Sequence, residues 1–520
     1  MKRGFLKKTM AAVLAAATAF SVAACGDKSA QKEDENGTVE LKVFSYMLSS
    51  EKFKEGDSQI LKYIKDKLNI EITPMAANAN NWNEKLNLVM TSGDMPDIFV
   101  SFGTGINNKQ YKKWIKMGLM SELDPDSTEY PNIAKVLKEF DYVKNFQGGK
   151  HYFLPIKGYQ GDYKASDDSA YYVRKDWLDN LGMKVPETRD EFINMMYAFG
   201  QKDPDGNGAA DTYGITSGSK AYGLPYNMFD TGYTGYEKKG DKYVSKMIGD
   251  NMKNAIKEFR KMYKGGAIDP EFLIASDLEE KFVGGKIGVY SSKGIWYDSI
   301  YNKFKQAYPD KDPEKMFACI ASLKDNNGNT IKKQGTENYY LMTSISGKAS
   351  KQKQKKAKEL LNFLLSDEGL KLMRYGVEGV HYKETDGKTE CLLPKNDNGE
   401  FKKLNEVEPA ANLLTLATWD SSFIPEWGQF REKRLALLDE SMSNAVPDPF
   451  RGIVLDENKI DTTTQKELES MTVEKAAELT MNDADIDSEW DKFVQQWSSS
   501  GGSVLNEEVN KEVEKNGLTE

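Results

Sequence analysis

Between residues 39 and 100 the sequence switches repeatedly between two hydrophobic periods, and this pattern limits the possible folds more than any other feature. Val39–Ser45 alternates apolar and polar residues, which predicts a strand, and Ile70–Thr73 and Asp97–Val100 predict two more. Between them, Ser58–Leu68 and Trp82–Thr91 have the spacing of amphipathic helices. Strands joined by helices in this order form a parallel sheet with helices on its faces. The sequence therefore predicts an α/β fold.

A second feature is a well-marked helix followed at once by an acidic loop. Thr188 is the predicted N-cap, and Glu191 stands where the reciprocal partner of a capping box belongs. After Gly200 the loop DPDGNGAAD alternates oxygen-bearing and small residues, with Gly208 at the sharp turn of an EF-hand loop. The candidate ligands are the side chains of Asp203, Asp205, Asn207 and Asp211 and the backbone carbonyl of Ala209.

This spacing predicts an EF-hand-like Ca²⁺ site, because a hard cation needs several oxygens converging at about 2.3–2.6 Å from one short loop. The twelfth position is Gly214, so the bidentate Glu of an EF-hand is missing and a further ligand must come from elsewhere. The ion would be structural. The alternative is a surface turn rich in Asp, Asn and Gly, which favour turns in any case.

The N-terminus predicts an exported lipoprotein. Residues 1–24 combine a basic start with an Ala-rich apolar stretch that is too short for a membrane span, which needs about 20 apolar residues. Val22-Ala23-Ala24-Cys25-Gly26 resembles a lipobox, in which Cys25 becomes the lipidated N-terminus. An ordinary cleavage site with an incidental cysteine is the alternative. Residues 25–38 are polar and predict a flexible tether.

Composition narrows the function. The net charge is −9, and removing the four Lys/Arg of residues 1–24, which contain no acid, leaves −13. So acidic a chain argues against nucleic acid and anionic membrane as partners, and runs such as Lys351–Lys358 predict solvated helix faces. Two histidines leave little for His-based catalysis or zinc. Cys319 and Cys391 lack metal-ligand spacing and either pair or stay as free thiols.

Several segments, taken in order, resemble family 1 extracellular solute-binding proteins, the receptors of ABC importers. The matching stretches are KLNLVMTSGDMPDIFV (Lys85–Val100), GGKHYFLP (Gly148–Pro155), YVRKDWLDNLGMKVPETRDEF (Tyr172–Phe192), FVGGKIGVYSSKGIW (Phe282–Trp296) and KAKELLNFLLSDEGLKLMRYGVEGVHY (Lys356–Tyr382). Among these proteins the chain is most similar to the large lipoproteins of Gram-positive bacteria, related to alginate-binding and oligosaccharide-binding receptors. Members of that subgroup carry a DPDGNG calcium loop.

The resemblance implies a two-lobed, periplasmic-binding-protein-like fold of type II with the ligand cleft between the lobes. Projected onto this chain, lobe one is 39–155 plus 337–376, and lobe two is 156–336 plus 377–520. The lobes would close about crossings near Pro155, Glu337 and Val377. The resemblance also implies a monomer, anchored by its lipid at the extracellular face of the cell membrane, that delivers an oligosaccharide to a two-subunit permease.

Sugar sites stack aromatic rings on the apolar face of the sugar and bind its hydroxyls with polar side chains. Trp296 and Tyr297 stand where sugar-binding relatives stack a ring, Trp419-Asp420 pairs a ring with a carboxylate, and Tyr46 follows a strand at its carboxyl end. Further candidates are Trp82, Phe102, Tyr163, Tyr226 and Glu378. Trp427 is assigned to the core, because Ile424 and Phe430 share its predicted helical face.

Three other functions stay open. The same fold could hold a peptide or a lipid-linked compound, or act as a sensor for a histidine kinase. An exported glycosidase would need two carboxylates about 5–10 Å apart across a cleft, and no specific pair is marked. The sequence GxxxxGK[ST] of an ATP-binding loop is absent, so the energy for import must come from a partner.

Overall fold

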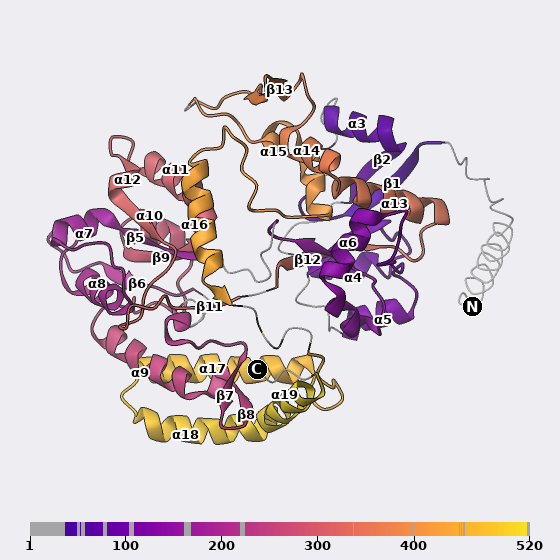
Figure 1. Cartoon of the computed structure of the whole chain (residues 1–520). Helices are drawn as coiled ribbons and strands as arrows, with labels where there is room; N and C mark the ends of the chain where they lie inside the picture. Colours follow the sequence, from indigo (N-terminus) through magenta and orange to yellow (C-terminus); the bar gives the residue numbers. More distant parts are fainter. Residues whose placement is uncertain are drawn as a thin grey trace, which may run out of the picture.

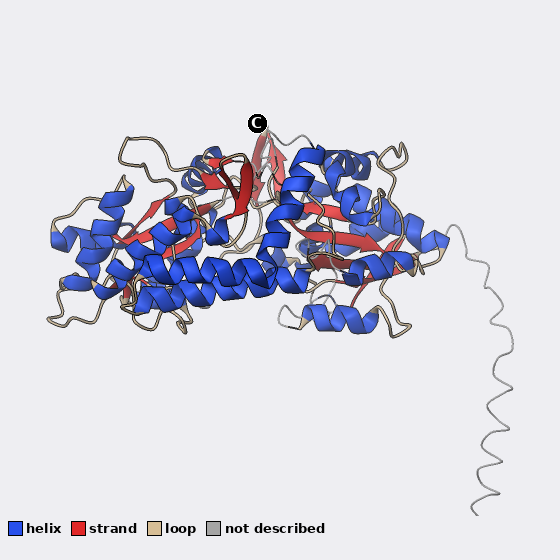
Figure 2. Ribbon diagram, turned by 90° about the horizontal axis from the view of Figure 1, so that it is seen from below, coloured by secondary structure: helices blue, strands red, loops and turns tan. Residues whose placement is uncertain are grey.

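The chain forms two α/β lobes that lie side by side (Figure 1). The computed structural model describes residues 37–48, 53, 58–75, 81–102, 109–160, 168–218, 224–335, 337–397, 399–446, 448, 450 and 453–516. Each lobe is built on its own sheet and flanked by helices (Figure 2). Within these ranges no helix is both long enough and apolar enough to cross a bilayer. The predicted two-lobed α/β architecture is confirmed.

Lobe one contains a five-stranded sheet in the order β2-β1-β3-β12-β4. Its strands are β1 (Val39–Phe44), β2 (Ile70–Met75), β3 (Ile98–Phe102), β4 (Leu154–Lys157) and β12 (Tyr339–Ile345). β1 pairs in parallel with β2 and β3, as the alternating pattern predicts. β12 returns from lobe two and pairs antiparallel with β3 and β4.

Helices cover both faces of this sheet, and their apolar sides form one continuous core with it. They are α3 (Gln59–Leu68), α4 (Trp82–Val89), α5 (Lys109–Lys116), α6 (Pro131–Glu139), α13 (Lys351–Leu364), α14 (Asp367–Tyr375) and the short α15 (Leu404–Val407). The side chain of Ser58 caps α3 by accepting from the Leu61 amide at 3.2 Å. Asn69, with φ 54°, ends α3 in the left-handed conformation and turns the chain into β2.

Lobe two contains a four-stranded sheet in the order β10-β5-β9-β6. Its strands are β5 (Ser169–Arg174), β6 (Tyr213–Ile215), β9 (Ile287–Lys293) and β10 (Phe317–Ile320). Along β5, Tyr171 and Val173 enter one core and Tyr172 enters another, because successive side chains of a strand point to opposite faces. α8 (Arg189–Gln201) begins at Thr188 with the predicted capping box to Glu191, which is confirmed.

The other helices of lobe two are α7 (Lys175–Leu181), α9 (Asp250–Lys264), α10 (Leu278–Val283), α11 (Tyr297–Ala307), α12 (Pro313–Met316), α16 (Arg431–Ser443), α17 (Thr462–Met481), α18 (Ile486–Trp497) and α19 (Ser503–Asn516). α17 and α18 lie beside α9 at the edge of the lobe, and α19 packs against the strand Lys242–Ser245 (Figure 1). Short two-stranded pairs complete the structure: β7 (Tyr236–Lys239) with β8 (Lys242–Ser245), β11 (Lys333–Gln334) with β15 (Ala445–Val446), and β13 (Tyr382–Thr385) with β14 (Lys388–Cys391).

Three chain segments cross between the lobes next to one another. The Gly158 amide donates to the Asn338 carbonyl at 3.0 Å, and the Asn338 side chain exchanges two further hydrogen bonds of 3.0 Å with the backbone of Tyr159. The Trp419 amide donates to the Lys157 carbonyl at 2.8 Å. The crossings therefore lie near residues 158, 338 and 419.

The third crossing differs from the predicted one at Val377. Leu393, Leu404 and Leu413 are buried in the core of lobe one, so the chain stays in that lobe through Ala417. Residues 377–417 thus extend lobe one beyond the predicted boundary at Gly376. Their apolar residues are too widely spaced for a periodic pattern to assign them to either lobe.

Candidate functional site: the cleft between the lobes

Four aromatic side chains form a connected row at the edge of lobe one that faces lobe two. Tyr46 follows β1, Phe102 ends β3, and Tyr340 lies at the start of the antiparallel β12, so all three stand at the carboxyl edge of the parallel strands. The ring centroids of Tyr46 and Trp82 are 4.9 Å apart, those of Trp82 and Phe102 4.4 Å, and those of Phe102 and Tyr340 5.3 Å. We call these four residues the aromatic row.

The aromatic row runs from the core to the surface. Trp82 is 1% exposed, Tyr46 and Phe102 are half-buried, and Tyr340 is 58% exposed. Burial raises the pKa of the Tyr46 hydroxyl, with a smaller contribution from Tyr340, so it remains an uncharged donor. Sequence reasoning missed Tyr340. The sequence gives no alternation there, because every residue of β12 except Tyr340 is buried.

In lobe two the ring of Trp296 is exposed. It lies in the 3₁₀ turn η5 (Gly294–Trp296) directly after β9 and is 49% exposed. The Lys293 ammonium lies 5.6 Å from the ring centroid, forms an ion pair of 3.1 Å with Asp168, and donates to the Tyr159 hydroxyl at 3.1 Å. Tyr159 in turn donates to Asp168. These contacts connect the ring to the first crossing segment.

Besides Trp82, which is buried in the core of lobe one, two further predicted ligand residues are core residues instead. Tyr297 is 1% exposed at the start of α11, where it packs against Phe317 at 5.1 Å, because the helix turns it inward. Tyr226 is 4% exposed, packs against Phe259 at 4.8 Å, and accepts from the Tyr233 hydroxyl at 2.8 Å. Neither offers surface to a ligand. Glu378 is exposed in the turn before β13, and Tyr163 and Cys25 lie outside the described residues.

A cavity of about 880 Å³ opens between the lobes beside the third crossing. Lobe one supplies Asn412 and Thr415, and lobe two supplies Asn302 and Arg434. Trp419 of the crossing, 38% exposed, lines the cavity as predicted for a cleft residue. The wall thus combines amide side chains with an aromatic ring, which suits hydroxyl-rich molecules.

Two neighbours of Trp419 differ from their predicted roles. The Asp420 carboxylate is buried, forms an ion pair with Arg374 and accepts from the Ser422 hydroxyl, so it is engaged within the protein. Trp427, assigned to the core, lines the cavity. Residues 426–430 form turns rather than the helix on which the core assignment depended.

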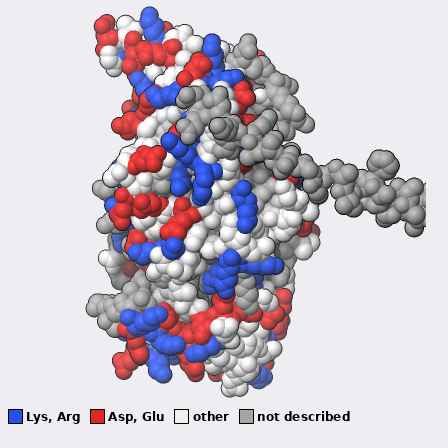
Figure 3. All heavy atoms as spheres, turned by 90° about the vertical axis from the view of Figure 1, so that its right-hand side faces the viewer, with Lys and Arg blue, Asp and Glu red and all other residues white. Residues whose placement is uncertain are grey.

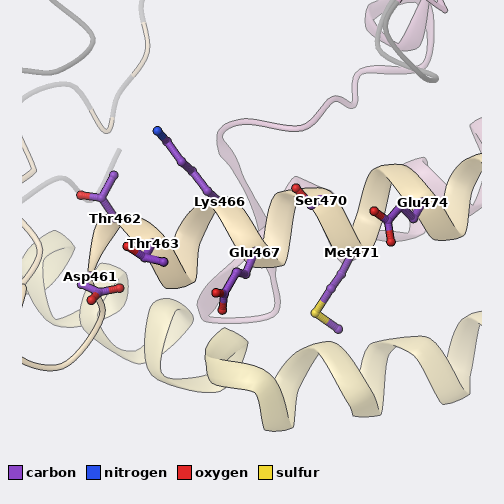
Figure 4. Close-up of a pocket in the computed structure, with 8 residues that line it drawn as sticks. All are labelled: Asp461, Thr462, Thr463, Lys466, Glu467, Ser470, Met471 and Glu474. Carbon is purple, nitrogen blue, oxygen red and sulfur yellow. The ribbon is translucent and has the colours of Figure 1, made fainter. Parts of the chain in front are cut away.

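A second concavity, of about 690 Å³, lies on the outer face of α17 (Figure 4). Its lining comes from one helix and the residue before it, and contains no aromatic ring. Lys466 points away from the neighbouring helices, while Met471 points toward one of them (Figure 4). This surface lacks the convergent polar and aromatic groups of the cleft.

The predicted calcium loop is folded around Asn207. The Asn207 side-chain amide donates to Asp205 at 2.9 Å and to Asp211 at 3.2 Å, and the Asn207 and Gly208 backbone amides donate to Asp203 at 3.1 and 2.9 Å. Among the described residues no group of three or more His, Cys, Asp or Glu side chains is placed to hold a metal ion. The loop therefore satisfies its carboxylates with hydrogen bonds.

The electrostatics of the loop fit a cation nonetheless. Burial and the neighbouring Asp203 raise the pKa of Asp205, while the Gly208 amide lowers the pKa of Asp203. Lys286, 2.6 Å from Asp211, lowers the pKa of that carboxyl. The three carboxylates repel one another, and Lys286 neutralises only part of their charge. A divalent cation bound to the loop would reduce this repulsion.

Comparison with known proteins places the chain in a family. The model of the bacterial extracellular solute-binding proteins matches residues 51–371, more than half of the chain. The chain belongs to this family. Two curated relatives come from Bacillus subtilis (strain 168). Lipoprotein LipO is 27% identical to this solute-binding protein, covering 98% of it and 99% of LipO. The polygalacturonan/rhamnogalacturonan-binding protein YtcQ is 25% identical and covers 86% of each chain.

Solved structures share the fold. An extracellular solute-binding protein from Bifidobacterium longum subsp. infantis superimposes with a TM-score of 0.68 at 20% identity, covering 93% of this chain and 99% of that one. The alginate-binding protein AlgQ2 without calcium ion gives a TM-score of 0.65 at 18% identity, covering 92% of this chain and 98% of AlgQ2. These likenesses agree with the two-lobed α/β fold described above.

Proposed function

We propose that this solute-binding protein captures an oligosaccharide between its lobes and delivers it to the two-subunit permease of an ABC importer. The aromatic row carries the proposal: four touching rings extend from the buried Trp82 to the exposed Tyr340 at the edge of lobe one that faces lobe two, which presents Trp296. Aromatic rings stack on the apolar faces of sugars, and amide side chains such as Asn302 and Asn412 bind hydroxyls. The names of the relatives YtcQ and the fructooligosaccharide ABC transporter substrate-binding protein FusA support this class of ligand.

The mechanism is capture without catalysis. The three crossings act as the hinge, and the ligand shifts the open and closed populations only by its higher affinity for the closed form. A glycosidase would need two available carboxylates across the cleft. The buried carboxylates of Asp298, which lines the cavity, and of Asp420, next to Trp419, are instead engaged by Arg434 at 3.1 Å and by Arg374.

Two further features belong to the proposal. Cys25 carries the lipid that holds the mature protein at the extracellular face of the cell membrane, as the lipobox-like sequence predicts. The loop of Asp203, Asp205, Asn207, Ala209 and Asp211 holds a structural Ca²⁺, whose role is to tie α8 to β6. A related structure, an EF-hand mutant of FusA in complex with fructo-nystose, supports an ion at this kind of loop.

A thermal-shift screen followed by calorimetry tests the ligand class. We expect one or a few members of a panel containing kestose, oligogalacturonates and chito-oligosaccharides to raise the melting temperature and bind with a Kd of about 1 μM or tighter, roughly −8 kcal/mol. Tyr340→Ala is expected to weaken that binding while leaving the fold intact. Stabilisation by a peptide library and by none of the sugars would overturn the proposal, as would cleavage of a bound sugar.

A further inference from the structure

The outer face of lobe one, which points away from lobe two, holds a cluster of lysines from two helices. The C-terminal end of α5 meets the N-terminal end of α13 there, where the Gly347 amide donates to the Leu119 carbonyl at 2.9 Å. The cluster, which we call the lysine face, consists of Lys113, Lys116, Lys348, Lys351 and Lys355. All five are exposed, and no carboxylate in the described part of the chain forms an ion pair with any of them. Figure 3 shows Lys and Arg side chains over the middle of this side of the molecule.

The acidic residues at the same edge are already neutralised. Asp97 pairs with Lys353 at 2.8 Å, Asp94 with Lys42 at 2.5 Å, and Glu359 with Lys356 at 2.7 Å. The net charge of −9 belongs to the whole chain. Charges farther from a surface than the Debye length of about 8 Å at physiological salt contribute little there. The lysine face therefore presents a positive field although the protein is acidic.

The position of the lysine face relative to the N-terminal segment points to its partner. β1 enters lobe one on this outer side and runs toward lobe two (Figure 1). The Val39 amide donates to the Asn69 carbonyl at 2.8 Å, and Lys356 of α13 donates to the adjacent Leu68 carbonyl at 2.7 Å. The first strand of the fold thus adjoins the helix that carries two of the five lysines, Lys351 and Lys355, with Lys348 in the turn before it.

We propose that the lysine face binds an anionic phospholipid surface and so orients the anchored receptor; this inference rests on the lipid anchor of the proposed function. The covalent length of residues 25–38 allows a reach of at most about 50 Å. An anchor at Cys25 therefore keeps the lysine face within reach of lipid headgroups. Met117, 50% exposed at the end of α5, supplies an apolar contact between the lysines.

The orientation has a consequence for capture. The aromatic row lies at the carboxyl edge of the lobe-one sheet and the lysine face at the opposite, amino edge. A receptor that rests on the lysine face holds its cleft away from the bilayer and open to solution. Docking on the permease then requires release from the lipid, which the weak, salt-sensitive nature of such contacts allows.

Vesicle sedimentation tests the proposal with the unlipidated mature chain, residues 26–520, so that the anchor contributes nothing. We expect binding to phosphatidylglycerol vesicles at low salt, little binding to phosphatidylcholine vesicles, and loss of binding at high salt. Each lysine near an anionic surface contributes about fivefold. The fourfold variant Lys116→Gln, Lys348→Gln, Lys351→Gln and Lys355→Gln should therefore bind roughly 600-fold more weakly.

The matched control removes four positive charges from a different part of the surface. The fourfold variant Lys238→Gln, Lys242→Gln, Lys383→Gln and Lys388→Gln removes four exposed lysines from the β7–β8 and β13–β14 hairpins and should bind vesicles as the parent chain does. Equal loss in both variants would show a net-charge effect and overturn the proposal. Tighter binding to soluble polyphosphate than to vesicles would overturn the assignment to lipid. Sugar binding, measured on the same variants, should not change, so failure of the ligand proposal is seen separately.

Discussion

The two lobes bring aromatic rings to the cleft in different ways. In lobe one the rings form a connected row from the buried Trp82 to the exposed Tyr340, so the binding surface is an extension of the core. In lobe two the exposed Trp296 stands alone on a short turn, supported by Lys293. A substitution in the buried part of the row should therefore affect stability and binding together, whereas one at the exposed Tyr340 or at Trp296 should affect binding only.

The largest expected effect is on stability and comes from the buried ring of the row, Trp82. Trp82→Ala should lower the free energy of unfolding by about 3–5 kcal/mol, because it removes a fully buried ring and leaves a cavity among Tyr46 and Phe102. Chemical denaturation measures the change. Tyr340→Ala, at the exposed end, should change stability by no more than about 0.5 kcal/mol. Equal losses for the two variants would contradict the view of the row as continuous from core to surface.

The next largest effect is expected on removal of calcium, which should lower the stability of lobe two and not that of lobe one. A chelator should destabilise lobe two by about 2.7 kcal/mol if the ion is present at about 100 times its Kd. Hydrogen exchange should then rise in α8 and β6, which flank the loop, and not in β1–β3 of lobe one. Asp205→Asn should reproduce the effect and make the protein insensitive to the chelator. Exchange that rises equally in both lobes would contradict a local role for the ion.

Trp296→Ala should weaken binding of the sugar found in the screen by about 1–3 kcal/mol, the usual contribution of a stacked ring at a binding site. Its unfolding free energy should stay within about 0.5 kcal/mol of the parent value, since the ring is half exposed. Isothermal titration calorimetry and chemical denaturation on the same preparation measure the affinity and the free energy of unfolding of the variant and the parent protein. A large loss of stability would show that the ring is integral to the core of lobe two.

The smallest expected effect concerns the acid stability of lobe one. Burial would raise the pKa of Glu408, but hydrogen bonds from His381, from the Ser58 hydroxyl at 2.6 Å and from the Gln59 amide at 2.9 Å outweigh it and lower the pKa. A folded-state pKa below the unfolded one adds stability above the unfolded value of about 4.3, and this stability is lost as the pH falls through the lowered pKa.

Glu408→Gln should therefore flatten the fall in lobe-one stability at acid pH and lower stability at neutral pH. Denaturation curves across that range, with hydrogen exchange to assign the lobe, measure both changes. The matched control is Glu406→Gln, which alters an exposed carboxyl two residues away. If the pH dependence of stability is unchanged in the Glu408 variant, the hydrogen bonds to Glu408, including that from His381, contribute nothing to stability.

Much of this arrangement was predictable from the sequence because it depends on short-range periodicity. β1, β2 and β3, the helices between them and the capping box at Thr188 are set by residues within a few positions of each other, and the structure has them within one to three residues of the predicted bounds. The two lobes were predicted instead from the resemblance of several ordered segments to a known family. Burial period and capping chemistry are local properties.

The cleft itself was decided by tertiary structure. Tyr340 joins Phe102 only because β12 returns from lobe two to pair with β3, and Asp420 is neutralised by Arg374, 46 positions earlier in the chain. Tyr297 points inward because of helix α11, although its neighbour Trp296 is exposed. Contacts between distant segments leave no period in the sequence, so which rings reach the surface is settled only when the lobes are assembled.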